Sequence, residues 1–532
     1  MENGIDAVRY PELVIGIAGA LGIDIEEIVS SLTDAFAAVS YSTRLIHITR
    51  EIAEEITNVP LPATSDFAAE ANFKMDHANA VCLKYGGPET LMRFAIRAIR
   101  QHRANQKIVV AGMDESVPPD ERVIPRTAYI IRQLKRPEEV HLLRKVYGKQ
   151  FILLSAYGSM ESRRSSLETR LKRSLPLNTP EYVISCNAEE LLHRDQNEGI
   201  ERSGQHLRDT FHLADVFIDG ISKIAMQETI SRFINAFFGK TDIAPSKAEY
   251  GMYAAKSASL RSTDLSRQVG AAIFTVDGEL ITQGCNEVPK AFGGTYWDGE
   301  NPDFRDVKLG FDPNDVLKKE VVRDLLERLA KGGMLSKRAL EIGHAAEIVD
   351  ALLKKPVTDA PEGYGCLSEA AVTDLTEYGR VVHAEMCAIC DAARLGRAIR
   401  GAILYCTTFP CHNCTKHLLA AGLSIVIFME PYPKSKAKEL HEHEVEIEQH
   451  STERVSFMPF IGISPFRYRD IFEKGRRKSS GIALKWISEG PQPMLDLSAP
   501  TYVDLESFEF HKLISDIRPF PADQVVASSQ PQ

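Results

Sequence analysis

Short apolar runs rich in valine and isoleucine alternate with amphipathic stretches along residues 1–236 of this 532-residue chain. The stretches between the runs have helical periodicity. Strands that alternate with helices predict an open α/β sheet in which the strands run parallel. The runs that have the length and composition of buried parallel strands are LVIGIAG (13–19), KIVVAG (107–112), TAYIIRQL (127–134) and FILLSAY (151–157).

The chain is too long for one hydrophobic core, and domains of ~100–200 residues predict two to four units. GKTDIAPSK (239–247) is a candidate linker because it contains turn formers and no apolar period. We therefore expect one domain at 1–238 and a second at 248–475. Residues 476–532 would form a C-terminal extension with a polar tail, poorly ordered over its last ten residues.

The second domain repeats the pattern of strands and helices. An insertion at about 296–378, with a charged helical stretch at 313–354, interrupts it. We expect an α/β/α layered arrangement. Its predicted elements are helices at 248–260, 383–395 and 411–421 and strands at 269–276, 278–286, 401–408 and 424–430.

Two short motifs in this domain have the spacing of a metal site. His383-Ala384-Glu385 opens one predicted helix, and Pro410-Cys411-His412-Asn413-Cys414 opens another. Cysteines three positions apart share one face of a first helical turn, where the helix dipole favours the thiolate. His383, Cys411 and Cys414 are therefore candidate Zn²⁺ ligands. Three protein ligands leave the fourth tetrahedral position to water, which is typical of a catalytic zinc rather than a closed structural one.

Glu385 lies two residues from His383 and is the candidate proton shuttle. It need not bind the metal, so it can move protons between the activated water and a substrate. The two motifs together match the H-x-E and P-C-x-x-C signature of zinc-dependent nucleobase deaminases, in which hydroxide attacks C4 of cytosine. The alternative is a structural zinc site or a chance spacing of cysteines.

The composition of the chain limits the classes of molecule that it can bind and the compartment in which we expect it. The net charge of −10 gives no general attraction to a polyanion, whereas a mononucleotide needs only a small basic pocket. Nine cysteines without a dense framework favour a reducing compartment. We find no signal peptide and no uncharged stretch of ~18 residues, so we expect a cytoplasmic protein without a membrane span.

The second domain resembles the deoxycytidylate deaminases beyond the zinc signature, in SLRSTDLSRQVGA (259–271), GCNEVP (284–289) and FMEPYPKSKA (428–437). The resemblance implies that Asn286 contacts the deoxyribose and base and that Tyr432 lies near the sugar-phosphate. Lys434 and Lys436 are our own candidates for phosphate contacts. Without the resemblance, Asn286 could equally be a turn residue, Tyr432 a half-buried aromatic and the lysines solvated.

The chain as a whole resembles the bacterial anti-phage dCTP deaminases, in which a P-loop-kinase-like domain precedes the deaminase. This resemblance implies conversion of dCTP and dCMP to uracil nucleotides during infection and, in some systems, a small inhibitory RNA as partner. We also expect a homo-oligomer. The resemblance covers roughly residues 10–475.

The N-terminal half departs from that pattern at its phosphate-binding loop. GIAGALGID (16–24) follows a predicted strand, and Gly16, Gly19 and Gly22 could bring backbone amides close to an anion. However, Ile23 and Asp24 stand where the P-loop has lysine and serine or threonine. We therefore expect no kinase or ATPase activity, and either a scaffold or a regulatory nucleotide site.

The sequence thus predicts zinc-dependent hydrolytic deamination of dCTP, dCMP or both. A dCMP deaminase of ordinary nucleotide metabolism is one alternative. Another is a deaminase of tRNA or single-stranded DNA, which would share the zinc motif. A binding protein with a vestigial deaminase is a third. The acidic net charge and the absence of an evident aromatic–basic groove disfavour the polynucleotide substrate.

Overall fold

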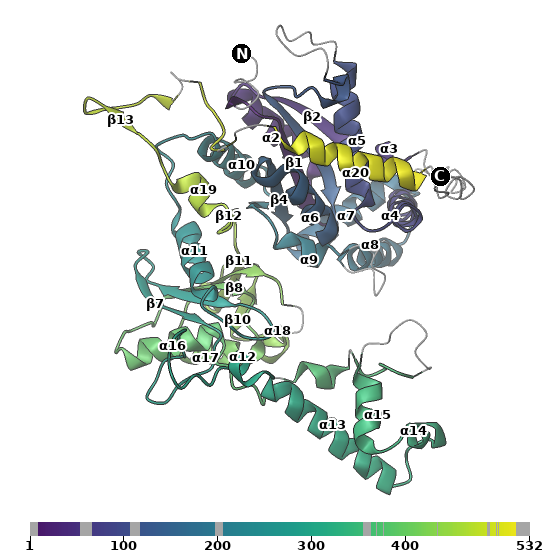
Figure 1. Cartoon of the computed structure of the whole chain (residues 1–532), viewed down its shortest axis with the longest axis vertical. Coiled ribbons are helices and arrows are strands. Elements are labelled where there is room, and N and C mark those ends of the chain that lie inside the picture. Colours follow the sequence, from purple (N-terminus) through teal and green to yellow (C-terminus); the bar gives the residue numbers. More distant parts are fainter. Residues whose placement is uncertain are drawn as a thin grey trace, which may run out of the picture. The chain divides into compact units, whose positions relative to one another are not determined.

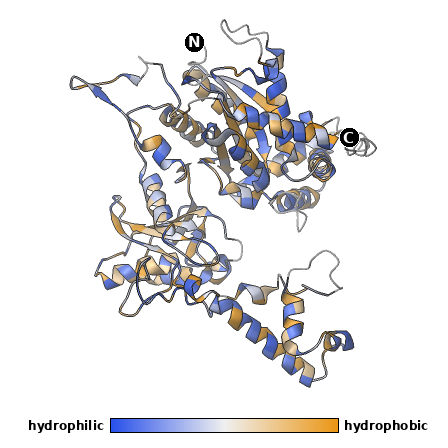
Figure 2. Cartoon of the chain, viewed as in Figure 1, coloured by the Kyte–Doolittle hydropathy of each residue, from blue (hydrophilic) through white to orange (hydrophobic). Residues whose placement is uncertain are grey.

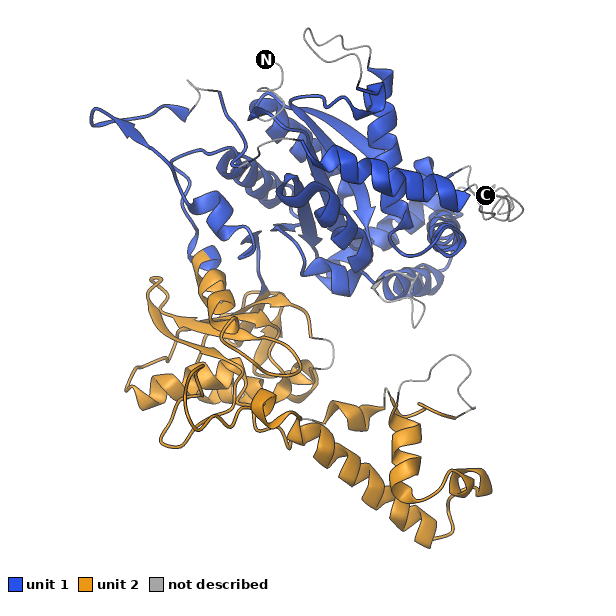
Figure 3. Cartoon of the chain, in the orientation of Figure 1, with its two compact units in different colours: residues 1–249, 459–532 blue, residues 250–458 orange. Residues whose placement is uncertain are grey.

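We describe a computed structural model of the chain (Figure 1). It describes residues 9–53, 66–106, 117–196, 206–354, 363–368, 370–375, 377–432, 435–486, 490–495, 497 and 500–517. Contacts divide the chain into two compact units (Figure 3). Unit 1 comprises Met1–Glu249 and Pro459–Gln532, and unit 2 comprises Tyr250–Met458.

This division differs from the expected boundaries, because the chain returns to unit 1 after residue 458. Strand β12 (Gly462–Ile463) pairs antiparallel with β5 (Val216–Asp219), at the edge of the sheet of unit 1. Arg467 follows it and forms a buried ion pair with Asp215, 3.1 Å between Nε and Oδ1. Residues 459–475 therefore complete unit 1, although we expected them in the second domain.

Unit 1 is built on a six-stranded sheet in the order β12-β5-β4-β1-β3-β2. All of its described pairings are parallel except the one that β12 makes. Strand β1 lies between β3 and β4 and is buried along its whole length, which explains its continuous apolar run (Figure 2). The strands that precede β12 are β1 (Leu13–Gly19), β2 (Ser42–His47), β3 (Thr127–Leu134), β4 (Phe151–Tyr157) and β5.

Helices accompany the strands of unit 1, and apolar residues of β1, α2 and α10 form the largest part of its core. The expected parallel α/β sheet is confirmed, whereas the predicted strand at 107–112 lies outside the described residues. The helices are α2 (Ile25–Ala38), α3 (Ile48–Glu51), α4 (Phe67–Lys84), α5 (Thr90–Asn105), α6 (Pro137–Tyr147), α7 (Met160–Ser174), α8 (Glu181–Gln196), α9 (Leu207–Phe211), α10 (Lys223–Phe237), α19 (Tyr468–Phe472) and α20 (Tyr502–Ile517).

Helix α20 is an element of the C-terminal extension that the sequence analysis did not predict, and it packs against α5 through buried charged groups. Arg103 donates from Nη2 to Glu12 Oε2 at 2.6 Å and to Glu506 Oε1 at 2.9 Å. Tyr502 donates to the same Glu12 oxygen at 2.9 Å. A hydropathy analysis misses such a helix, because the carboxylates that it buries against charged partners count as polar in the sequence. The last ten residues lie outside the described part of the chain.

Unit 2 contains a second six-stranded sheet, in the order β10-β11-β9-β8-β6-β7. Strands β6 and β7 form the hairpin expected at Asp277-Gly278, and β8 pairs antiparallel with β6 and parallel with β9. Every strand and helix predicted outside the insertion is present within a few residues. The strands are β6 (Gly270–Phe274), β7 (Leu280–Cys285), β8 (Ile403–Thr408), β9 (Ile425–Glu430), β10 (Val445–Ile447) and β11 (Val455–Pro459).

Helices α11 (Lys247–Ser259), α16 (Ala384–Arg394), α17 (His412–Ala420) and α18 (Ala437–Leu440) belong to this part of the chain. The insertion adds α12 (Asp306–Leu309), α13 (Pro313–Lys331), α14 (Lys337–Glu341) and α15 (Ala345–Leu353). Helices α13 and α15 pack on one another around Val322, Leu326, Ile348 and Val349, so the insertion has a small core of its own. Among the described residues, no helix is both long and apolar enough to span a bilayer.

Candidate active site

His383 lies directly before α16, where the chain leaves a short stretch of paired backbone. Val382 and Glu287 exchange backbone hydrogen bonds of 3.1 and 3.2 Å, and this bridge fixes the entry to the helix. His383 occupies the N-cap position of α16, but its side chain makes no capping hydrogen bond. The imidazole is instead directed at two thiols.

The two thiols come from the start of α17, which follows β8 after a short turn. Cys411 is the N-cap residue of α17, and its Sγ accepts a hydrogen bond from the Cys414 amide at 3.4 Å. Nδ1 of His383 lies 3.4 Å from the Sγ atoms of both Cys411 and Cys414. All three side-chain atoms lie within 4.8 Å of one another. The structure therefore brings the three predicted ligands together from two helix N-termini.

The distances fit a tetrahedral zinc ion. Bonds of ~2.3 Å to sulfur and ~2.1 Å to nitrogen place such ligand atoms about 3.6 Å apart, close to the 3.4 Å found here. Two thiols and one imidazole also suit zinc, whereas magnesium and calcium prefer oxygen ligands. Zinc is the metal that these residues would hold.

Hydrogen bonding within the cluster shifts the ligands' titration. The contacts of the Cys411 thiol with Cys414 and then with His383 lower its pKa to about 4. The hydrogen bond to Cys411 raises the pKa of His383 to about 9, and the pKa of Cys414 is raised, first by its hydrogen bond to Cys411. Without a metal the cluster thus carries protons on His383 and Cys414. Zinc must displace both of them, because it binds thiolate and neutral imidazole.

Glu385 lies in the first turn of α16 and is 4% exposed. Burial raises the pKa of its carboxyl group. The carboxylate stands outside the group of three metal-ligating atoms, yet it lines the same pocket. This position suits a residue that exchanges protons with a substrate beside the metal.

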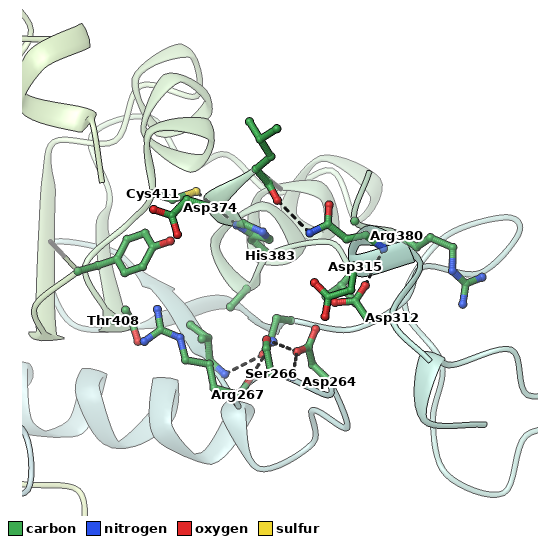
Figure 4. A pocket seen from close by; sticks show the side chains of 18 of the residues that line it. Asp264, Ser266, Arg267, Asp312, Asp315, Asp374, Arg380, His383, Thr408 and Cys411 are labelled. Carbon is green, nitrogen blue, oxygen red and sulfur yellow. Dashed lines mark hydrogen bonds between the residues drawn. The ribbon is translucent and has the colours of Figure 1, made fainter. Parts of the chain in front are cut away.

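His383, Glu385 and Cys411 line a pocket of about 460 Å³, a volume suited to a nucleotide-sized ligand. Figure 4 shows Arg267 and Thr408 on one side of the pocket and Asp312, Asp315 and Arg380 on the other. The insertion therefore supplies a wall of the site, although the sequence had given it no role. Its lining residues are Asp312, Asn314, Asp315, Lys318, Thr373, Asp374 and Leu375.

Asn286 and Tyr432 both line the pocket, as their predicted roles require. The Asn286 amide is 7% exposed and engaged with a neighbouring loop: Oδ1 accepts from the Val269 amide at 2.7 Å, and Nδ2 donates to the Arg267 carbonyl at 2.8 Å. Lys434 lies outside the described residues. Lys436 is exposed and pairs with Glu439 at 3.0 Å, outside the residues that line the pocket.

Arg267 was missed by the sequence analysis, although the signal was present. The β6–β7 hairpin pairs Gly270 with Cys285, which sets Val269 beside Asn286. A register counted back from the Asp277-Gly278 turn would have brought Arg267 to the site. For the insertion no such count exists, because no strand pairing among its described residues connects it to the sheet.

The three glycines of the candidate phosphate loop occupy different environments. Gly16 lies inside β1, where a Cβ atom would come within 3.0 Å of the Phe151 ring, so it serves strand packing. Gly19 ends the strand. Gly22 lies in the turn with φ +93°, and a Cβ there would come within 2.5 Å of the Arg163 carbonyl oxygen. The turn that could meet a ligand thus begins after Gly19.

That turn is held by a carboxylate of the protein itself. Asp195 at the end of α8 accepts a hydrogen bond from the Leu21 amide at 2.7 Å. Lys135 donates to the other Asp195 oxygen at 2.6 Å and to the Gly19 carbonyl at 2.7 Å, and both side chains are buried. A cavity of about 300 Å³ adjoins the turn, and Leu21, Lys135 and Asp195 are among the residues that line it.

Comparison with known proteins identifies the second unit. Residues 245–430 match the family model of the cytidine and deoxycytidylate deaminase zinc-binding region. The chain carries a cytidine and deoxycytidylate deaminase domain. The metal of this family's binding region is zinc, and, among the described residues, His383, Cys411 and Cys414 form a group that could bind it.

Curated relatives match over short segments. The deoxycytidylate deaminases of Enterobacteria phages T2 and T4 are each 42% identical over 55 residues, 10% of this chain and 29% and 28% of theirs. The ComE operon protein 2 of Bacillus subtilis is 35% identical over 70 residues, 13% of this chain and 37% of that protein. The chain thus spans less than two fifths of the length of these relatives.

Among solved structures, the chain is similar to the dCMP deaminase of cyanophage S-TIM5 in complex with dCMP and dUMP. The match has 16% identity, covers 41% of this chain and 98% of that one, and has a TM-score of 0.22. The apo form of the same enzyme gives 17% identity, 41% and 100% coverage and a TM-score of 0.20.

Proposed function

We propose that unit 2 catalyses the hydrolytic deamination of free deoxycytidine nucleotides, dCMP and dCTP, to the corresponding uracil nucleotides and ammonia. The observation that carries the proposal is the convergence of His383, Cys411 and Cys414 beside the buried carboxyl of Glu385 at one pocket. The sequence matches to phage deoxycytidylate deaminases support the substrate class.

The chemistry divides between the metal and one side chain. His383, Cys411 and Cys414 would hold zinc, which would supply an electrophilic centre that acidifies a water molecule. Glu385 accepts the proton of that water as its oxygen attacks C4 of cytosine, and passes the proton to N3. The carboxyl group then carries the second proton to the departing amino group. Water and cytosine thus become uracil and ammonia, with Glu385 returned to its starting state.

Burial prepares Glu385 for this role. Because desolvation raises its pKa, the carboxyl group binds a proton more firmly than an exposed glutamate and can retain it between the two transfers. Its helix also places His383, so the ligand and the proton carrier share one rigid element.

The role of the reaction is a further part of the proposal. Conversion of dCTP and dCMP would deplete the deoxycytidine nucleotides that a replicating phage needs, as the resemblance to anti-phage dCTP deaminases implies. A small inhibitory RNA is proposed as a partner on the same resemblance, and homo-oligomerisation is a separate part of the proposal. The degenerate loop after β1 makes unit 1 a scaffold or a regulator in this account.

A panel of substrates tests the proposal. Purified zinc-loaded protein is incubated with dCMP, dCTP, CTP and a cytosine-containing single-stranded oligonucleotide, and ammonia and uracil products are measured. We expect turnover of dCMP or dCTP and much slower reaction of CTP. Equal turnover of CTP would show that the enzyme does not select a deoxyribose sugar. Reaction of the oligonucleotide alone would make the protein a polynucleotide deaminase.

A further inference from the structure

A strongly basic hairpin follows helix α19 in the chain. Residues 474–485, which we call the basic hairpin, contain five lysines and arginines and neither aspartate nor glutamate, although the whole chain has a net charge of −10. Within it, strands β13 (Lys478–Ser479) and β14 (Ile482–Ala483) pair antiparallel. The basic residues of the hairpin are Lys474, Arg476, Arg477, Lys478 and Lys485.

The turn and the base of the basic hairpin give it a defined form. The two residues that connect the strands have φ angles of +50° and +82°, as the tight turns of hairpins require. At the base, Lys474 Nζ donates to the Lys240 carbonyl at 3.2 Å, and Trp486 Nε1 donates to the Phe238 carbonyl at 2.7 Å. Both ends of the hairpin are therefore tied to the chain just after α10. Figure 3 shows that the hairpin extends away from the helices and the sheet of unit 1.

The protein does not neutralise the positive charges of this hairpin. Arg476 donates to the Lys478 carbonyl at 3.1 Å, within the hairpin itself. Arg476, Arg477 and Lys478 are all exposed, and none of them forms an ion pair with another residue that the structure describes. The acidic residue that directly precedes the hairpin, Glu473, is paired with Arg469 at 3.0 Å. The three cations are therefore available to an external anion.

The composition of the hairpin favours a nucleic-acid backbone as that anion. Arginine, lysine and serine side chains are the usual contacts to phosphate groups, and Ser479 and Ser480 lie beside the cations. A lipid surface is disfavoured, because a basic cluster needs a second, apolar signal for stable attachment and Ile482 alone, 74% exposed, is small. A single strand is disfavoured as well, because residues 474–485 include no aromatic side chain on which bases could stack.

The shape of the hairpin selects among duplexes. A two-stranded β-ribbon fits the major groove of B-form DNA, which is about 12 Å wide, whereas side chains cannot enter the narrow major groove of A-form RNA. We propose that the basic hairpin binds double-stranded DNA, with Arg476, Arg477 and Lys478 on its phosphate groups. The contact is independent of base sequence, because phosphate contacts carry no sequence information. The hairpin belongs to unit 1, so the inference stands apart from the chemistry proposed for unit 2.

Fluorescence anisotropy tests the inference on the full-length, zinc-loaded protein. A labelled DNA duplex of about 20 base pairs is titrated at salt concentrations from about 50 to 200 mM. Three phosphate contacts predict a slope of about −3 for the logarithm of the association constant against the logarithm of the salt concentration, which is a ~40-fold loss of affinity over this range. A stem-loop RNA of similar length should bind at least ~10-fold more weakly than the DNA duplex.

Variants locate the contact on the hairpin. In the hairpin variant, three exposed cations become glutamine, and we expect duplex affinity at low salt to fall at least ~10-fold and the salt slope to approach zero. The hairpin variant combines Arg476→Gln, Arg477→Gln and Lys478→Gln. A charge-conserving variant, Arg476→Lys with Arg477→Lys, should retain the slope. The matched control removes the same number of exposed charges from α13. This control combines Arg323→Gln, Arg328→Gln and Lys331→Gln.

Each outcome decides for or against the inference. Duplex binding that is lost in the hairpin variant and kept in the control would sustain it. Equal losses in the two variants would overturn it, because the effect would then follow net charge alone. Unchanged affinity in the hairpin variant, or a wild-type protein that binds no duplex, would also overturn it. So would tighter binding of the stem-loop RNA, of a single strand or of vesicles that contain phosphatidylserine, because the partner would then be a different one.

Discussion

Each unit contains a strand that leads through a short turn into a helix, and the two turns use their polar groups in opposite ways. In unit 1, β1 leads into α2, and the N-cap Asp24 accepts the Glu27 amide at 3.1 Å. In unit 2, β8 leads into α17, and the N-cap is Cys411, whose thiol faces His383 and Cys414. In the first turn the cap side chain binds a backbone amide of its own helix. In the second turn the cap side chain is a candidate metal ligand.

The turn of unit 1 is bound at several points by other residues of the same unit. Ile23, where a phosphate-binding lysine would stand, is 2% exposed and belongs to the hydrophobic core. The Leu21 amide is bound by Asp195, and the Asp24 amide donates to the Gly220 carbonyl at 3.3 Å. The comparison teaches that a glycine-rich turn after a strand marks a site only when its donors remain available. The predictions below test each side of this contrast.

The largest expected effect is on catalysis in unit 2. Glu385→Gln removes the proton carrier and should lower the deamination rate ~10²–10⁴-fold. Zinc content should stay at about one ion per chain, because the carboxylate is not a ligand. Rates and metal content are measured in parallel, with the exposed Glu439→Gln as the matched control. An active variant would refute the mechanism, and a zinc-free variant would make Glu385 a ligand.

In unit 1, the corresponding substitution is Asp195→Asn, which should lower the stability of the unit and leave deamination unchanged. Asp195→Asn leaves Lys135 buried without its partner, which should cost about 3–5 kcal/mol of unfolding free energy. The chain has two tryptophans, so in a Trp297→Phe background the fluorescence of Trp486 reports on unit 1 during urea unfolding. Asp76→Asn, at an exposed ion pair, is the control. An unchanged midpoint would show that Asp195 does not hold the turn.

The pH dependence of zinc binding sharpens the account of the ligands. The pKa values of His383, about 9, and of Cys414 are both raised, so below pH 9 each group carries a proton that zinc must displace. Zinc affinity should therefore fall as pH falls, by ~10² for each pH unit between 8 and 6. Competition with a chelator at several pH values measures the slope. A pH-independent affinity would contradict the assigned proton positions.

The smallest expected effect is an absence of activity. Unit 1 should release no phosphate from ATP or GTP, because Ile23 and Asp24 serve the core and the helix cap. Phosphate release is measured for the wild type, for Glu385→Gln and for Gly22→Val, which disrupts the turn. Release that persists in Glu385→Gln and vanishes in Gly22→Val would show that the turn is a working nucleotide site.

The sequence predicted the regular parts of both units because their signals are local. Buried strands such as β1 and β4 appear as apolar runs, and the zinc ligands appear as fixed spacings at helix starts. The return of the chain at β12 was not predictable in this way, because a two-residue edge strand has no periodicity. Helix α20 was missed for another reason: its buried glutamates are neutralised by Arg93 and Arg103, which lie far away in the sequence.

In the candidate active site, too, the residues with a local sequence signal were predictable and the others were not. His383, Glu385, Cys411 and Cys414 were found because each motif lies within five residues. Arg267 depends on a hairpin register, and the wall formed by Asp312, Asn314 and Asp315 depends on where an insertion folds back. Such contacts are set by tertiary packing, to which a local pattern is blind.

The central claim is that unit 2 replaces the amino group of a deoxycytidine nucleotide with oxygen from water. Incubation of zinc-loaded protein with dCMP and dCTP in H₂¹⁸O tests it directly, with mass spectrometry of the products and an ammonia assay. The account predicts uracil nucleotides that carry one ¹⁸O atom each, with one ammonia released per product and no product from Glu385→Gln. Unchanged dCMP and dCTP in the presence of bound zinc would contradict it.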